Sequence, residues 1–175
     1  MSLASPFVLR AATPGDVPLI LSCIRGLAEY EKLAHEVVAT EALLRETLFG
    51  SRRAAEVILA FHHDDAAGFA LFLHSYSTFL ARPGIYLEDL FVLPAYRGRG
   101  VGKLLLARLA RLAVDRGCAR LEWSVLDWNV DAIRFYESIG ARAMTEWTTN
   151  RVTGDALAAL AAAQGEVGAL AAAKS

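Results

Sequence analysis

The sequence of 175 residues has only two cysteines and almost no excess charge of either sign. Cys23 and Cys118 lie in apolar surroundings, without a CxxC partner or a histidine at metal-ligand spacing. This predicts reduced thiols in a cytoplasmic protein and argues against a disulfide or a bound metal. The formal net charge of −1 argues against a nucleic-acid partner, which would need a large basic surface.

Long apolar runs are missing as well. No stretch of about 18 apolar residues is free of interruption, and the N-terminus lacks the basic start, apolar run and cleavage site of a signal peptide. We therefore expect no contact with a membrane. The alanine-rich segment 156–173 predicts a helix, followed by a loose tail within the last ~15 residues.

What is present is typical of one folded domain over residues 1–175. Hydrophobic residues make up 55% of the chain and charged residues 21%. The hydrophobic periodicity predicts strands at 7–10, 55–61, 68–74, 85–92, 121–125 and 141–149, and helices at 14–28, 41–50, 100–115 and 131–139. This order predicts an α/β fold of three layers, with a mixed sheet between helices on both faces. Strands 85–92 and 121–125, joined by a helix, should be parallel.

The strongest signal for binding lies at residues 96–103, between a predicted strand and a predicted helix. Gly98, Gly100 and Gly102 let backbone N–H groups face outward at a helix N-terminus, where unpaired amides and the helix dipole favour anions. The cationic residues of the same segment are Arg97, Arg99 and Lys103. The segment therefore predicts a site for a phosphate or a diphosphate.

Three other interpretations of this loop compete with an anion site. A dinucleotide-binding loop requires G-x-G-x-x-G, but Lys103 occupies the last glycine position. A P-loop requires Ser or Thr after Gly-Lys, but Leu104 follows. A flexible turn without a ligand is the third, and the agreement of strand, loop and basic helix start favours the anion site over it.

The pattern Arg97-x-x-Gly100-x-Gly102, directly after a strand, resembles the R/Q-x-x-G-x-G/A motif of the GNAT N-acetyltransferases, which binds the diphosphate of coenzyme A. Segments 86–92 and 128–136 are similar to those of the spermidine/spermine and thialysine acetyltransferases within that family. The resemblance implies the GNAT fold and acetyl-CoA as co-substrate, with no metal. It implies cofactor contacts at Leu90, Phe91, Val92, Arg97, Gly98, Arg99, Gly100, Val101, Gly102, Lys103, Asn129, Asp131 and Ala132.

The same resemblance implies that an acetyl group moves to a primary amine of a small molecule, by direct attack through a tetrahedral intermediate. Glu88 would take the amine proton through water, and the phenol of Tyr136 would protonate the leaving thiolate. Alternation along a strand predicts that Glu88 and Asp89 point to opposite faces, so Asp89 would gather cationic substrate or support the fold. Tyr30 and Glu31 match substrate-side positions, where an aromatic ring and an acid suit a cation.

The sequence leaves the substrate and the assembly open. Relatives that acetylate polyamines carry an acid and a tryptophan ahead of the Glu88 strand, whereas residues 74–79 contain neither. Diamines or polyamines, lysine-like amino acids and other small amines are therefore all retained. The alternative functions are a protein lysine or N-terminal acetyltransferase and a non-catalytic acyl-CoA-binding module. The resemblance also implies a homodimer.

Overall fold

The computed structural model describes residues 6–172, with side chains as far as residue 163. The chain divides into two compact units, Met1–Leu126 and Asp127–Ser175, and each is described by itself. The first unit contains β1 (Phe7–Ala11), α1 (Val17–Tyr30), α2 (Glu41–Phe49), β2 (Glu56–His62), β3 (Asp65–Ser77), β4 (Arg82–Val92), α3 (Val101–Asp115) and β5 (Leu121–Trp123). The second contains α4 (Val130–Ser138) and α5 (Gly154–Ala172).

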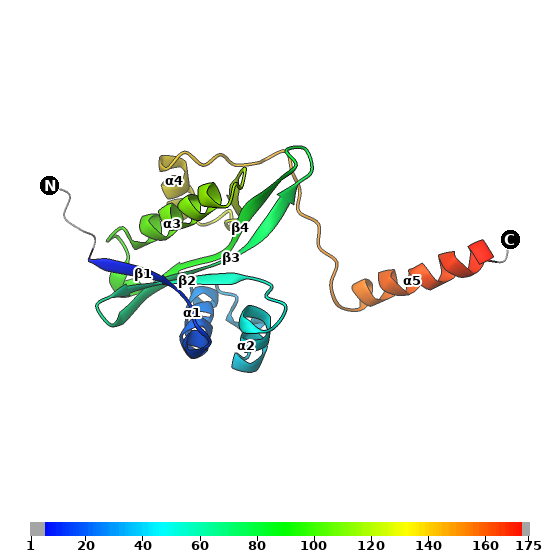
Figure 1. The fold of residues 1–175 in the computed structure, drawn as a ribbon, viewed down its shortest axis with the longest axis horizontal. Helices are drawn as coiled ribbons and strands as arrows, with labels where there is room; N and C mark the ends of the chain where they lie inside the picture. The colour runs from blue at the N-terminus through cyan, green and yellow to red at the C-terminus, as the bar shows by residue number, and fades with distance from the viewer. Residues whose placement is uncertain (1–5, 173–175) are drawn as a thin grey trace. The chain divides into compact units, whose positions relative to one another are not determined.

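The five described strands form one mixed sheet in the order β1-β2-β3-β4-β5. The first four are antiparallel to their neighbours, while β4 and β5, which α3 connects, are parallel. Helices α1 and α2 cover one face of this sheet and α3 covers the other (Figure 1). The predicted three-layer α/β fold and its parallel strand pair are therefore confirmed.

Apolar side chains fill the space on both faces of the sheet. Under α1 and α2, the buried residues are Val17, Ile20, Leu21, Cys23, Leu44, Leu48, Val57, Leu59, Phe69 and Phe91. On the α3 side, Val101, Leu105 and Leu109 are almost completely buried. Each fully buried side chain of this size stabilises the fold by about 1.5–3 kcal/mol, so the two layers hold the sheet firmly in place.

Helices α1 and α3 each end at a residue with left-handed backbone. At the end of α3, Gly117 has φ +66°, and Cys118 N donates to Ala113 O, which is the pattern of a Schellman cap. At the end of α1 the same pattern is formed by Lys32, with φ +62°, and Leu33 N donates to Ala28 O at 2.8 Å. Because Lys32 is not a glycine, α1 ends in a strained residue.

Two predictions need correction at the C-terminal side of the sheet. The strand predicted at 141–149 is wrong: this stretch pairs with no described strand, and Trp147 N donates to Met144 O in a local turn. Alternating apolar residues are not enough, because a strand also needs a partner for its backbone groups. Strand β5 ends at Trp123, two residues earlier than predicted.

Helix α5 confirms the helix predicted in the alanine-rich segment, and it extends to Ala172. The end of the expected loose tail, residues 173–175, lies outside the described residues. Within the part of the chain that the structure describes, no helix combines the length and the apolar character needed to cross a membrane.

Candidate functional site

The glycine-rich loop lies between β4 and α3, as predicted. Gly98 and Gly100 have φ of +70° and +85°, a conformation that glycine adopts without strain, and Gly100 is the N-cap of α3. A Cβ on either glycine would meet nothing within 4 Å, so open space lies outside the loop. The amides of the first helical turn, from Val101 to Lys103, have no acceptor within α3. The local geometry is therefore that of an anion site.

Arg97 is held at the base of this loop by three groups. Its Nε donates to the carbonyl oxygen of Val92 at 3.0 Å. Its Cζ lies 4.7 Å from the ring centroid of Tyr30 and 5.6 Å from that of Phe91. The structure thus brings together Arg97, which was predicted to bind the cofactor, and Tyr30, which was predicted to bind the substrate.

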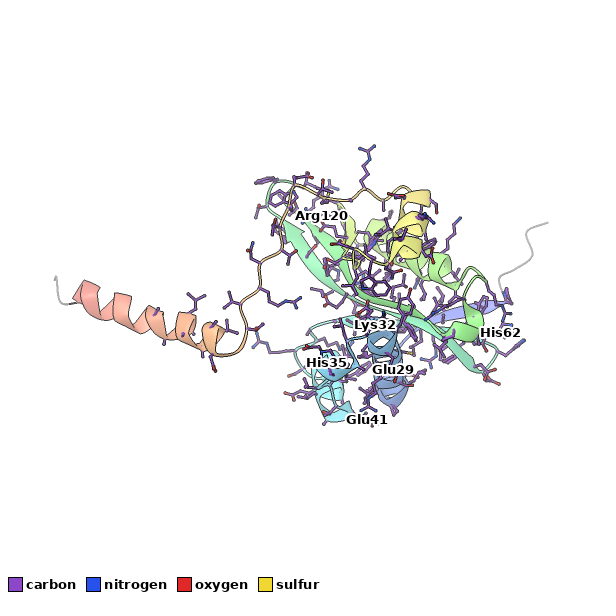
Figure 2. All side chains as sticks on the ribbon, turned by 180° about the vertical axis from the view of Figure 1, so that it is seen from behind. Glu29, Lys32, His35, Glu41, His62 and Arg120 are labelled. Carbon is purple, nitrogen blue, oxygen red and sulfur yellow. The ribbon has the colours of Figure 1, made fainter. Side chains whose placement is uncertain are left out.

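Arg99 belongs to a second aromatic cluster, which the sequence analysis missed. Its Cζ lies 5.3 Å from the ring centroid of Tyr96 and 5.4 Å from that of Phe7. His62 lies at the end of β2 (Figure 2). Its ring centroid is 5.3 Å from that of Phe7 and 5.7 Å from that of Tyr96. These residues come from three distant segments, so no sequence pattern could have grouped them.

The strand β4 is irregular at Glu88. Leu71 is opposite Asp89 and Phe72 is opposite Leu87, so Glu88 is the extra residue of a β-bulge. The argument that Glu88 and Asp89 point to opposite faces assumed a regular strand, and that assumption does not hold here.

Three acidic side chains gather around this bulge. Burial, and after it the nearby negative charges of Glu88 and Glu31, together raise the pKa of Asp89 to about 6. Burial also raises the pKa of Glu31, at the C-terminal end of α1. Neighbouring carboxylates that disfavour each other's ionisation form a site where a cation is favoured.

Beyond Leu87, one edge of β4 is not covered by β5. β5 pairs only with Ile85–Leu87, whereas β3 pairs with β4 as far as Val92. Leu93 N donates to Ala67 O in the direction of β3. Because backbone groups alternate along an antiparallel strand, the amides of Leu90 and Val92 point the other way, to the uncovered edge, while that of Phe91 points to β3.

The remaining predicted residues lie together on α4 in the second unit. Asn129 is the N-cap of this helix, and its side chain accepts a hydrogen bond from Ala132 N at 3.4 Å. Asp131 lies in the first turn. Tyr136 is half-buried, with its ring centroid 5.4 Å from that of Phe135. α4 thus presents the predicted pantetheine-side residues and the predicted acid on one short element.

The part of the chain described here contains no arrangement of side chains suited to a metal ion. No group of three or more His, Cys, Asp or Glu side chains is placed to hold an ion among those residues. Cys23 and Cys118 are free thiols, and the first of them is buried.

Comparison with known proteins finds relatives of this chain in sequence and in structure. Residues 24–141 match the model of the Acetyltransferase (GNAT) family. The chain is 40% identical to the L-ornithine N5-acetyltransferase of Arabidopsis thaliana in an alignment of 197 positions, gaps included, which covers 87% of this chain and 86% of that protein. It is 41% identical over 165 residues to the thialysine N-epsilon-acetyltransferase of Bos taurus, covering 88% and 96%. Among solved structures, an integron cassette protein from V. cholerae superimposes with a TM-score of 0.76 at 28% identity, covering 89% of this chain and 98% of that one.

Proposed function

The chain belongs to the GNAT acetyltransferase family, and from this premise we propose that it acetylates the side-chain amine of a lysine- or ornithine-like amino acid. It is an N-acetyltransferase, and enzymes of this family use acetyl-CoA. The finer choice of substrate is supported by the two relatives named for thialysine and ornithine, and by the missing acid in residues 74–79. Diamines and polyamines are the competing substrates within the same chemistry.

The observation that carries the proposal is the contact of Arg97, in the anion loop, with two aromatic residues that neighbour the acidic cluster. Arg97, in the loop, lies over Tyr30 and Phe91. Tyr30 is adjacent to Glu31, and Phe91 is two residues from Asp89 along β4. A site for a diphosphate and a site for an ammonium group therefore lie side by side, which is what transfer from an anionic carrier to a cationic amine requires.

The residues of the loop fit the diphosphate of coenzyme A. The positive φ of Gly98 and Gly100 turns the backbone so that amides of α3 face open space, where no Cβ stands in the way. We assign the binding of the diphosphate to these amides, from Gly98 to Lys103, together with the cations Arg97 and Arg99. When bound, acetyl-CoA supplies the activated acetyl group.

The acidic cluster prepares the acceptor. A free alkylammonium has a pKa of about 10 and cannot attack until it loses a proton. Glu31 and Asp89 attract and orient the ammonium group, and Glu88, the exposed residue of the bulge, removes the proton through water. The neutral nitrogen then forms a bond to the acetyl carbon and gives a tetrahedral intermediate. The carbon–sulfur bond breaks as this intermediate collapses, and the nitrogen releases its second proton to water.

Two further groups complete the reaction. The amides of Leu90 and Val92, at the uncovered edge of β4, hold the acetyl carbonyl oxygen as negative charge develops on it. Tyr136 donates its phenolic proton to the leaving thiolate. Asn129, Asp131 and Ala132 contribute contacts to the pantetheine arm from the start of α4.

The proposal extends to the organisation of the protein. The family match runs without a break from residue 24 to residue 141, across both compact units, which supports a single acetyltransferase domain over residues 1–175. We propose further that the protein forms a homodimer and works in the cytoplasm, where its two thiols stay reduced.

Release of free coenzyme A from acetyl-CoA, measured over a panel of amines, tests the function. The panel contains ornithine, lysine, thialysine, putrescine, spermidine and a lysine-containing peptide. We expect the highest kcat/KM with one of the three amino acids. Highest turnover with the peptide would assign a protein acetyltransferase instead, and tight coenzyme A binding without turnover on any amine would assign a binding module.

A further inference from the structure

The ring of Tyr30 is in contact with a cationic side chain of the protein itself, the guanidinium of Arg97. Arg97 Cζ lies 4.7 Å from the centroid of the Tyr30 ring, within the range of a cation–π contact. Tyr30 is the last residue of α1 and is 39% exposed, so a side chain from the loop can reach its ring. The contact therefore joins two elements that are 67 residues apart in number, through one side chain each.

Arg97 is fixed in direction as well as in place. The bond from Nε to the Val92 carbonyl oxygen, 3.0 Å long, fixes one edge of the guanidinium, and the Tyr30 ring faces the guanidinium carbon. A long arginine side chain loses much rotamer freedom when it binds an anion. If the arginine side chain is already held before the anion binds, this loss of entropy does not reduce the affinity for the anion.

A substrate ammonium is a poor second occupant of this ring. Bound over the face that holds Arg97, it would lie only a few ångströms from the guanidinium, at a distance where like charges repel appreciably even in a polar environment. The carboxylates of Glu31, Glu88 and Asp89 offer the amine a better site without that repulsion.

We propose that Tyr30 is a positioning residue for Arg97, and so acts on the affinity for the coenzyme A diphosphate and not on the affinity for the amine. This inference rests on the proposed function, since it assumes that the loop binds coenzyme A. It replaces the earlier expectation that Tyr30 contacts the cationic substrate.

The test compares two Tyr30 variants by calorimetric titration with coenzyme A. Tyr30→Leu, which removes the ring, should weaken the affinity about three- to fivefold, the usual size of a partly exposed cation–π contact. Tyr30→Phe, which keeps the ring, should stay within about twofold of wild type. Tyr76→Leu is the matched control, since Tyr76 is 62% exposed and lies opposite Pro83, at the other end of the β3–β4 pair from Val92 and the loop. The affinity of this variant should equal that of wild type.

A double-mutant cycle shows whether Tyr30 acts through Arg97. In an Arg97→Met background, Tyr30→Leu should cause no further loss of coenzyme A affinity, because the cation that the ring holds is gone. The KM for the amine should change less than twofold in Tyr30→Leu at saturating acetyl-CoA. If the leucine variant has lost its far-UV circular dichroism, Tyr30→Gln takes its place.

Two results would overturn the inference. One is a Tyr30→Leu enzyme with wild-type coenzyme A affinity and a raised KM for the amine, which would return Tyr30 to the substrate site. The other is an equal loss in both backgrounds of the cycle. Failure of the proposed function would give another result, since the wild-type protein itself would then not bind coenzyme A.

Discussion

The ring of Phe91 occupies the place where a side chain on Gly26 would lie. A Cβ built on Gly26, in the middle of α1, would be 2.9 Å from Cε1 of Phe91 and 3.0 Å from its Cζ. Phe91 is on β4, two residues after Asp89, and its ring also lies under Arg97. The close approach of α1 to β4 at this one point therefore brings the end of α1 to the acidic cluster and the loop.

Gly26→Ala should destabilise the fold although alanine favours helices. Displacing a buried ring costs about 1–3 kcal/mol, and the gain in helix propensity offsets up to about 1 kcal/mol of it. We expect a net loss of about 1 kcal/mol in urea unfolding, together with a weaker affinity for coenzyme A. Gly15→Ala is the control, since its Cβ would meet only Thr13 Oγ1 at an ordinary 3.7 Å. A Gly26→Ala protein as stable as wild type would contradict the tight packing.

Alanine substitutions of Gly100 and Gly102 should affect the stability of the fold differently, although both should weaken coenzyme A binding. Gly100 has φ +85°, so Gly100→Ala should lower stability by about 1–2 kcal/mol and weaken coenzyme A binding as well. Gly102 lies inside α3, and its Cβ would meet Val92 Cγ2 at 3.7 Å, so Gly102→Ala should fold as well as wild type. Because the added methyl group projects beside the amides, Gly102→Ala should still lose coenzyme A affinity. Thermal unfolding with and without coenzyme A measures both effects, and equal ligand-induced shifts in Gly102→Ala and wild type would place the diphosphate elsewhere.

Asp89 should make the fold less stable as pH rises from about 4 to about 6. The pKa of Asp89 is raised to about 6 by burial, Glu88 and Glu31, above its value of about 3.9 in the unfolded chain. Between these two values the unfolded chain ionises while the folded protein keeps its proton, so stability is lost over this window and the penalty is constant above it. Asp89→Asn should remove it, and should gain about 1–3 kcal/mol relative to wild type between pH 4 and pH 7.5 in urea unfolding. A difference between the two proteins that is the same at both pH values would contradict this.

Asp89→Asn should also lose activity. Without this carboxylate the amine loses one of its charge partners, so the KM for the amine should rise while the affinity for coenzyme A stays the same. A variant that is more stable but less active would identify Asp89 as a residue kept for function.

Lys32→Gly should stabilise the protein. Lys32 ends α1 with φ +62°, where glycine is unstrained, whereas Gly117 and Gly140 fill the corresponding positions of α3 and α4. Figure 2 shows Lys32 at this end of α1, near Glu29 and His35. We expect a gain of roughly 0.5–1 kcal/mol in chemical unfolding. Lys32→Ala, which removes the charge but keeps the strain, is the control and should show no such gain.

Tyr136→Phe should lower kcat without changing coenzyme A binding. Losing a general acid typically costs about 100-fold or more in rate, whereas the ring itself and its packing on Phe135 are retained. Steady-state rates and calorimetric titration measure the two quantities separately. An unchanged kcat would remove Tyr136 from the mechanism.

Local chemistry explains which parts of this protein were predictable. The strand, glycine loop and amphipathic helix from 85 to 115 follow from hydrophobic periodicity and from the conformational freedom of Gly98 and Gly100. By contrast, the bulge at Glu88 depends on how β4 aligns with β3, which no local pattern encodes. The strand predicted at 141–149 was wrong for a similar reason, because alternation describes a strand but does not provide its partner.

The sequence by itself determined the layers, the anion loop and the family resemblance, because each depends on residues that are close together in the chain. Only the tertiary structure decided that Arg97 meets Tyr30, that Glu31 lies near Asp89, and that Gly26 must have no side chain. Those relationships join α1 to β4 and its loop across more than 50 residues, so they exist only after the helix has packed on the sheet.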